Sequence, residues 1–218
     1  MGKEKVVLKF LEKKYGKDIK ISKKQNQKIY ELLIETILSQ RNRDESTEKV
    51  AKKLFSNART PKQIMKLSRE RLQTLIRTSG PYKQKAKKIR RTTRAIIEKY
   101  NGKVPSIREE LMSLYGVGPK TADIVLMYGF NIPSIAVDTH CNRVPKRIGL
   151  VDRKANVEEV KHRLEEIFPK NKWYLINLGF VTFGKNICKP TSPVCKKDKK
   201  SCPFSDFCRA FKQKDFKV

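Results

Sequence analysis

The stretch Leu114-Tyr115-Gly116-Val117-Gly118-Pro119-Lys120-Thr121-Ala122 is the most informative part of this 218-residue chain. Two glycines one residue apart allow a tight backbone turn, and the proline that follows suits the first turn of a helix. Such a turn points backbone N–H groups outward beside a helix N-terminus, which suits a phosphate. The stretch therefore predicts a helix-turn-helix that grips a nucleic-acid backbone without reading its sequence, with an ordinary helix–helix corner as the alternative.

Lys120 lies in the first turn of the second predicted helix. The partial positive charge of a helix N-terminus, together with nearby cations, favours the neutral amine, which is a nucleophile. A lysine that only contacts phosphate is the competing interpretation. On local evidence Lys120 is therefore a candidate nucleophile or a candidate phosphate contact.

Asp138 follows the apolar run Ile135-Ala136-Val137 and precedes Thr139-His140. Aspartate is a common N-cap, so Asp138 is expected to open a helix. A capping aspartate that faces a cleft can also act as a base or as an electrostatic stabiliser. Both roles remain open for Asp138 at this point.

Outside these motifs, apolar residues recur at helical spacing along almost the whole chain, and alternating strand patterns are missing. Breakers such as Thr60-Pro61, Ser79-Gly80-Pro81 and Asn101-Gly102 separate the apolar segments. We therefore predict an all-α fold of many short helices. The clearest of these helices in the second half of the chain span 106–115, 119–130, 136–148, 156–167 and 172–184.

The chain carries 51 Lys and Arg against 22 Asp and Glu, a formal net charge of +29. So large an excess favours a polyanionic partner, most commonly nucleic acid, over a charge-rich thermophile surface. No apolar run reaches the roughly 18 residues that a membrane span needs. The N-terminus Met1–Lys5 leads into an amphipathic helix instead of a signal peptide, so we expect a cytoplasmic, nucleoid-associated protein.

The motif Leu-x-Gly-Val-Gly-x-Lys-Thr-Ala at Leu114–Ala122, followed by Val-Asp-Thr-His at Val137–His140, resembles the helix-hairpin-helix DNA glycosylases. The likeness is greatest to the endonuclease III group, with an archaeal-type branch as a further possibility, and it extends from about Tyr30 to Cys208. It implies a two-lobed all-α fold. One lobe would be residues 25–131 with the hairpin at about 107–126, and the other would join 1–24 to 132–218.

The resemblance implies a bifunctional DNA glycosylase/AP lyase of base excision repair that removes damaged, oxidised pyrimidines and nicks the strand by β-elimination. Lys120 would attack the sugar and Asp138 would stabilise the developing positive charge or relay a proton. The partner would be double-stranded DNA holding a damaged base or an abasic site, bound by a monomer. Further residues expected to contact DNA are Gly116, Val117, Gly118, Thr121, His140 and Arg143, although His140 also suits a structural role.

Four cysteines, Cys188, Cys195, Cys202 and Cys208, are separated by six, six and five residues. Structural zinc sites usually contain a closer cysteine pair, whereas iron–sulfur clusters are commonly held by four thiolates. The family carries a [4Fe–4S] cluster on such a set, with the same outer gaps and a shorter middle gap than Cys195–Cys202. The resemblance thus implies a [4Fe–4S] cluster at 188–208, and Cys141 is expected to be a packing residue.

Two segments are expected to influence the choice of base. Arg41 stands where endonuclease III usually has the glutamine that fills the hole left by a flipped base, and a shift of one residue would give Gln40 that role. The loop Ser79-Gly80-Pro81-Tyr82-Lys83 resembles the family loop that wedges into the duplex, with Pro81 where a bulky apolar residue is usual. These departures leave open uracil or thymine opposite guanine, or an alkylated purine. A non-catalytic DNA-binding scaffold is the alternative from another functional class.

Overall fold

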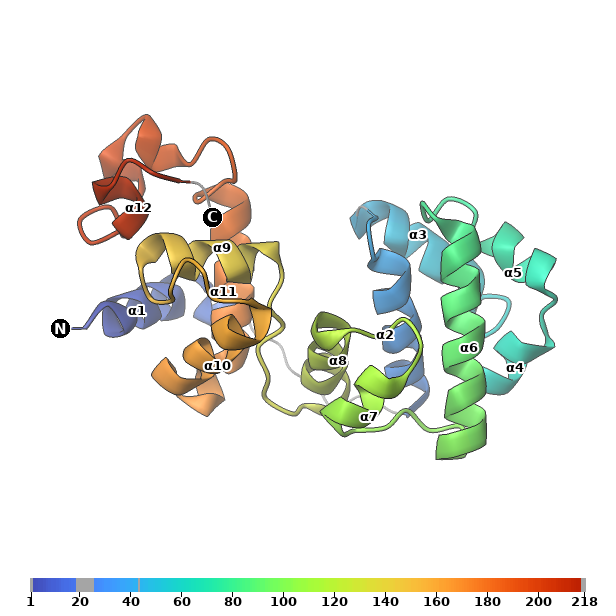
Figure 1. Cartoon of the computed structure of the whole chain (residues 1–218). Helices are drawn as coiled ribbons and strands as arrows, with labels where there is room; N and C mark the ends of the chain where they lie inside the picture. The colour runs from blue at the N-terminus through green and yellow to red at the C-terminus, as the bar shows by residue number, and fades with distance from the viewer. Residues whose placement is uncertain (1, 19–25, 43, 217–218) are drawn as a thin grey trace. The chain divides into compact units, whose positions relative to one another are not determined.

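The computed structural model describes residues 2–18, 26–42 and 44–216 (Figure 1). These residues form α-helices with short 3-10 and π turns and contain no strand, which confirms the all-α prediction. The chain divides into two compact units, Ile21–Ile132 and the pair of segments Met1–Lys20 and Pro133–Val218. Across the described residues, no helix combines the length and the apolar character that a membrane crossing requires.

The unit Ile21–Ile132, called the hairpin unit below, is built around α2. This helix packs against α3, α6, α8 and η2. Leu33, Ile34, Ile37 and Leu38 of α2 are fully buried, because residues three and four apart share one helix face. The elements of the unit are α2 (Asn26–Ser39), α3 (Asp44–Phe55), α4 (Pro61–Lys66), α5 (Arg69–Leu75), α6 (Tyr82–Tyr100), α7 (Arg108–Ser113), α8 (Pro119–Val125) and the π-helical turn η2 (Leu126–Phe130).

The helix α6 has one apolar and one strongly charged face. Ala86, Ile89 and Ile96 are buried against α2, α4 and α5. The helix ends at Asn101, whose φ of 51° is the left-handed conformation that commonly stops helices. The opposite face of α6 is exposed and carries charged residues that include Lys87, Arg91 and Arg94.

The second unit, called the cysteine unit below, is organised around α11. Helix α11 packs against α9 and α1, and Gly179 allows the close approach of α1, since a Cβ there would lie 2.9 Å from Leu11 Cδ2. The elements are α1 (Lys3–Tyr15), η1 (Gly16–Asp18), α9 (Thr139–Ile148), α10 (Val157–Ile167), η3 (Lys170–Lys172), α11 (Trp173–Asn186), η4 (Val194–Lys196), η5 (Lys199–Ser201) and α12 (Arg209–Lys212).

Two helices differ from the sequence-based expectation. The helix expected over 136–148 begins only at Thr139, because the side chain of Asp138 caps it and the preceding residues are not helical. The helix expected over 119–130 changes to a π-helical turn from Leu126 onward. Apolar spacing alone does not distinguish a buried non-helical segment from a helix end.

Candidate active site

The hairpin consists of α7, the turn Leu114–Gly118 and α8. Gly116 has a φ of 87°, and a Cβ built there would lie 2.7 Å from Lys88 Cγ, so glycine is needed for both conformation and space. Gly118 is the N-cap of α8 with a φ of −100°, and a Cβ there would meet nothing within 4 Å. The turn thus exposes the backbone at the start of α8 in the geometry that suits a phosphate.

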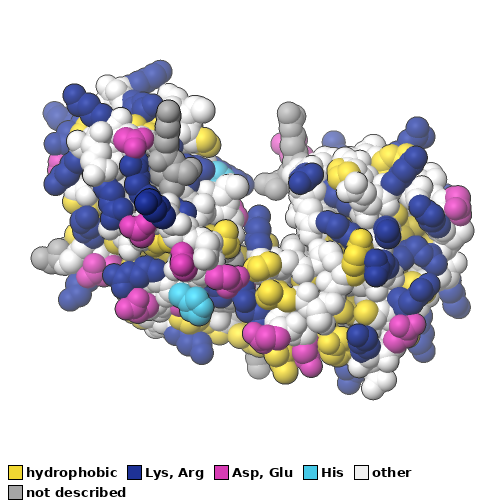
Figure 2. Space-filling view, in the orientation of Figure 1, with side chains coloured by type: hydrophobic (Ala, Val, Ile, Leu, Met, Phe, Trp, Pro, Cys, Tyr) yellow, Lys and Arg dark blue, Asp and Glu magenta, His cyan; other side chains and the backbone are white. Residues whose placement is uncertain are grey.

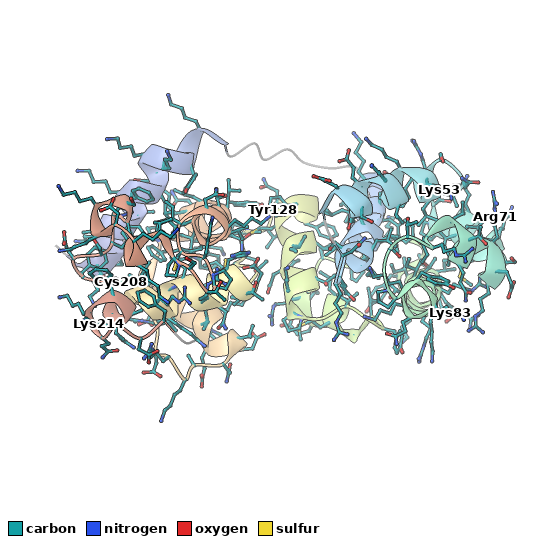
Figure 3. All side chains as sticks on the ribbon, turned by 90° about the horizontal axis from the view of Figure 1, so that it is seen from above. Lys53, Arg71, Lys83, Tyr128, Cys208 and Lys214 are labelled. Atoms are coloured by element: carbon teal, nitrogen blue, oxygen red, sulfur yellow. The ribbon has the colours of Figure 1, made fainter. Side chains whose placement is uncertain are left out.

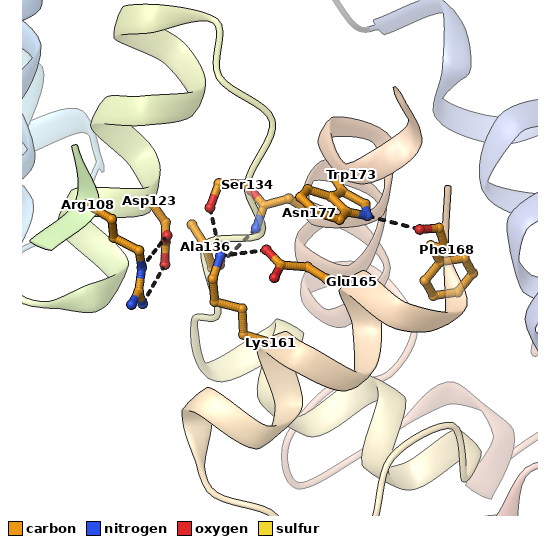
Figure 4. A network of polar contacts seen from close by, with 9 residues as sticks. All are labelled: Arg108, Asp123, Ser134, Ala136, Lys161, Glu165, Phe168, Trp173 and Asn177. Carbon is orange, nitrogen blue, oxygen red and sulfur yellow. Dashed lines mark hydrogen bonds and ion pairs between the residues drawn. The ribbon is translucent and has the colours of Figure 1, made fainter. Parts of the chain in front are cut away.

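An ion pair ties the two helices of the hairpin together (Figure 4). Arg108 Nε donates to Asp123 Oδ1 at 2.9 Å, and Asp123 is buried. Lys120 lies in the first turn of α8 with an exposed side chain. Lys120 forms no hydrogen bond or ion pair within the part of the chain that the structure describes, so its amine is available to a substrate.

Gln40 connects the end of α2 to this hairpin. Its Nε2 donates to the carbonyl oxygen of Gly116 at 3.0 Å, and its Oε1 accepts a hydrogen bond from Lys88 Nζ at 2.7 Å. Thr121 Oγ1 lies 3.5 Å from the same Nε2. Gln40, one of the two residues expected to affect base recognition, is therefore held directly against the hairpin turn.

Lys85 is a residue of this region that the sequence analysis missed. Its side chain is only 2% exposed, and its ammonium donates to the carbonyl oxygens of Leu38, at 2.5 Å, and Ser79. Burial, aided by the charge of Lys88, lowers the pKa of Lys85 to about 8. Its position on the same helix face as Ile89 and Ile96 was the available signal, because a lysine on an apolar face needs polar partners.

The loop before α6 lies against the end of α2. A Cβ built on Gly80 would be 3.5 Å from the carbonyl oxygen of Arg41, and Arg41 itself is exposed with a φ of 54°. Pro81 and Lys83 are exposed, whereas Tyr82 is half-buried against the core of the unit. The hairpin unit therefore brings together three separate sequence motifs: the end of α2, the loop 79–81 and the hairpin.

Asp138 belongs to the cysteine unit, where it is the N-cap of α9. Its Oδ1 accepts hydrogen bonds from the backbone N–H groups of His140, at 2.9 Å, and Cys141, at 2.8 Å. Both bonds go to one carboxylate oxygen, which leaves Oδ2 for another partner. Asp138 is half-buried, so the second oxygen sits on a firmly held side chain at the surface of its unit.

Polar contacts on both sides hold the non-helical segment that leads to Asp138 (Figure 4). Asn177 Nδ2 of α11 donates to the carbonyl oxygen of Ala136 at 2.8 Å. Lys161 of α10 donates to Ser134 Oγ at 2.7 Å and forms an ion pair with Glu165 at 2.6 Å. These contacts fix the backbone before Asp138 in a conformation that a helix would not provide.

His140 and Arg143, both expected to contact DNA, lie on α9 and face protein groups. Arg143 is buried, and its guanidinium donates to the carbonyl oxygens of Thr139, Gly184 and Cys188 and lies 3.1 Å from His140 Nδ1. Burial lowers the pKa of His140; the Asp138 carboxylate opposes this shift and Arg143 adds to it. As placed, Arg143 links α9 to the start of the cysteine loop.

The four expected metal ligands all belong to the cysteine unit. Cys195, Cys202 and Cys208 are buried and Cys188 is half-buried. Burial raises the pKa of Cys202 to about 12, and the charges of the other three thiols add to the increase. Four cysteines in one short segment, three of them buried, fit a positively charged centre that takes thiolate ligands.

Arg147 of α9 joins both ends of this loop. Its Nη1 lies 3.6 Å from Cys188 Sγ, and its carbonyl oxygen accepts from Cys208 Sγ at 3.2 Å.

Among the described residues, no three His, Cys, Asp or Glu side chains are grouped to hold a single metal ion. In a cluster of several irons, each of the four thiolates can bind a different iron, so the four sulfurs need not surround a single ion. Cys141 is fully buried against Asn177, in agreement with the expected packing role.

Basic side chains cover much of the surface of both units (Figures 2 and 3). The hairpin unit thus holds the candidate nucleophile Lys120 and the candidate phosphate-binding turn, and the cysteine unit holds the carboxylate of Asp138.

The chain is similar to known DNA repair proteins. The family model described as HhH-GPD superfamily base excision DNA repair protein matches residues 34–170. The chain is 44% identical to Endonuclease III of Thermotoga maritima over 85% of this chain and 84% of that protein. It is 38% identical to Endonuclease III of Escherichia coli K12, with 85% of each chain covered.

Two solved structures are also similar to this fold. A trapped Endonuclease III–DNA covalent intermediate gives a TM-score of 0.86 at 37% identity, covering 98% of this chain and 99% of that one. A thermostable thymine-DNA glycosylase gives a TM-score of 0.80 at 25% identity, covering 96% and 95% of the two chains.

Proposed function

The chain belongs to the HhH-GPD superfamily of base excision DNA repair proteins, and we propose that Lys120 and Asp138 carry out its reaction. The protein is a DNA glycosylase with AP lyase activity that acts on oxidised pyrimidines in double-stranded DNA. The observation that carries the residue assignment is the exposed, unengaged amine of Lys120 in the first turn of α8, directly after the turn Leu114–Gly118.

The first step is displacement of the base. Lys120 Nζ attacks C1′ of the flipped nucleotide, the C1′–N bond breaks, and its electron pair leaves with the base. Asp138 stabilises the positive charge that develops on the sugar, through the carboxylate oxygen that does not cap α9. The attacking amine gives up one proton, which the departing base takes. The C1′–O4′ bond of the sugar then breaks as the C1′=N bond of the protonated Schiff base forms, and the ring oxygen takes a proton from water.

The second step is strand cleavage. The protonated Schiff base makes a C2′ proton acidic, and its removal expels the 3′ phosphate by β-elimination. Lys120 thereby supports both base removal and nicking. The backbone at Gly116 and Gly118 binds the phosphates, and Gln40, Arg41 and the loop 79–81 contact the bases around the flipped nucleotide.

We propose that Cys188, Cys195, Cys202 and Cys208 hold a [4Fe–4S] cluster. When bound, this group cross-links the loop 188–208 through four thiolates, and the reaction requires no electron transfer from it. Arg143 and Arg147 connect that loop to α9, which begins at Asp138. The thiolates therefore support the helix that presents the carboxylate.

Borohydride trapping on DNA with an abasic site tests the role of Lys120. Wild-type protein is expected to form a covalent adduct, and Lys120→Ala is expected to form none while still binding the DNA. Lys66→Ala, which removes an exposed lysine of α4 in the same unit, is the control and should retain the adduct. An adduct that persists in Lys120→Ala would overturn the assignment.

Iron and sulfide analysis, with visible absorbance, tests the cluster. Cys202→Ser should lose the absorbance and Cys141→Ala should retain it, because Cys141 lies outside the ligand set. Zinc in place of iron in the purified wild-type protein would contradict the proposal.

Thymine mispaired with guanine is a second candidate target, favoured by Arg41 and by the likeness to a thymine-DNA glycosylase. A duplex series containing an oxidised pyrimidine, uracil, mismatched thymine or an alkylated purine distinguishes the targets. The oxidised pyrimidine is expected to be removed fastest.

A further inference from the structure

The exposed face of α6 carries a continuous row of cations, Lys83, Lys87, Arg91 and Arg94, which we call the basic row. Their spacing of four, four and three residues places all four on one side of the helix. In Figure 2 a run of Lys and Arg side chains lies over α6, and Figure 3 labels Lys83 at the start of this helix.

Three members of the row border a hollow of about 320 Å³ together with Arg69 and Arg90. Every residue that lines this hollow is basic. Within the described residues, none of these five side chains forms an ion pair. Arg90 is instead held by a hydrogen bond from Nη1 to the carbonyl oxygen of Leu67 at 2.5 Å.

The basic row has no evident role in folding. Like charges three or four residues apart on a helix repel each other, so the row destabilises α6 when nothing binds to it. A row of cations that form no ion pairs within the described residues is typical of a surface that binds a polyanion.

The row is connected to the hairpin. The Arg91 guanidinium lies 3.8 Å from the centre of the Tyr115 ring, a cation–π contact with the turn that is proposed to bind phosphate. Thr92 Oγ1, one residue further along α6, donates to the carbonyl oxygen of Tyr115 at 2.6 Å. The hairpin and the row are therefore parts of one rigid surface.

We propose that the basic row is a second DNA-backbone contact, which binds duplex DNA flanking the lesion as an extension of the hairpin contact. From Lys83 to Arg94 the helix rises about 16 Å, and duplex DNA presents one phosphate per strand about every 3.4 Å, so the row spans roughly five phosphates. This inference rests on the proposed function only in taking DNA as the polyanion.

The test compares two triple variants with the same loss of charge. Lys87→Gln/Arg91→Gln/Arg94→Gln removes three cations of the row. Lys5→Gln/Lys9→Gln/Lys13→Gln removes three exposed lysines at similar helical spacing from α1 in the other unit. All six side chains are exposed, and thermal melting checks that both variants remain folded.

Binding of a duplex with an abasic-site analogue is measured by fluorescence anisotropy over a series of salt concentrations. Each lost phosphate contact lowers the slope of log K against log salt by about 0.9, so the row variant should have a slope smaller by about 2 to 3. The α1 control should keep the wild-type slope. Equal slopes in the two variants would overturn the proposal, and an acidic partner other than DNA would then account for the row.

A second measurement varies the length of the DNA. Wild-type protein should bind a long duplex more tightly than one that ends close to the lesion, and the row variant should lose most of that difference. Borohydride trapping with wild-type protein at low salt is scored separately. An absent adduct would refute the proposed function, whereas the salt slopes and the length dependence decide the row by themselves.

Discussion

Gln40 donates a hydrogen bond to the carbonyl oxygen of Gly116 at 3.0 Å while accepting another from Lys88 at 2.7 Å. One side chain thus fixes the end of α2 against the turn that is proposed to grip phosphate. Gln40→Ala removes both bonds, each worth about 1 kcal/mol, and should weaken binding to abasic-site DNA roughly tenfold. Anisotropy titration measures this loss, and Gln84→Ala, an exposed glutamine on α6, should bind like wild type.

The two glycines of the hairpin should respond differently to alanine. Gly116→Ala places a Cβ 2.7 Å from Lys88 Cγ at a φ of 87°, so it should reduce stability by about 1 kcal/mol or more. Gly118→Ala meets nothing within 4 Å at an ordinary φ and should leave the melting temperature unchanged or slightly higher. Its added methyl stands at the start of α8, where the phosphate is proposed to approach, so DNA binding should fall. Unchanged binding in a folded Gly118→Ala variant would place the phosphate elsewhere.

Asp138 has a structural and a proposed chemical role, and two substitutions separate them. Asparagine is as good an N-cap as aspartate, so Asp138→Asn should keep the stability of the wild type within about 0.5 kcal/mol. Asp138→Ala removes the acceptor of the His140 and Cys141 N–H bonds and should cost about 1 kcal/mol. Both variants should lose base-removal activity, because both lose the negative charge. Single-turnover assays and urea unfolding measure the two effects, and an active Asp138→Asn enzyme would reduce Asp138 to a helix cap.

Lys85 gives a prediction about pH. Burial lowers its pKa to about 8 in the folded state, below the ordinary lysine value of 10.5. The unfolded chain therefore binds more protons than the folded chain between these values, and the free energy of unfolding rises with pH. The penalty of the buried charge is fully present below pH 8 and is relieved as the pH rises through this window. Between about pH 7.5 and 9.5, wild-type protein should gain roughly 1 to 2 kcal/mol relative to Lys85→Met.

Urea unfolding of the two proteins at several pH values checks this gain. The difference in the free energy of unfolding between the two proteins isolates the titration of Lys85, because the other lysines contribute equally to both. Lys87→Met, at an exposed position on the same helix, is the matched control and should show no such slope. A parallel pH dependence for wild type and Lys85→Met would show that Lys85 titrates normally.

The sequence alone determined the all-α class and the family, and it predicted the hairpin and the candidate pair Lys120 and Asp138. Helical periodicity and glycine chemistry are local properties, so Leu114–Ala122 could be interpreted without the rest of the chain. The start of α9 was placed too early, since apolar spacing continues into a segment that is held by Asn177 and Lys161 and is not helical.

Only the tertiary structure decided which partners the polar side chains take. Lys85 and Lys88 belong to the same lysine-rich helix. Lys85 is buried between two carbonyl groups, whereas Lys88 donates a hydrogen bond to Gln40. Arg143 could be a DNA contact by composition, but the fold surrounds it with carbonyl acceptors from α11 and the cysteine loop. Leu38 lies 47 positions from Lys85 and Gly184 lies 41 positions from Arg143, and hydrogen bonding depends on distances that no local pattern encodes.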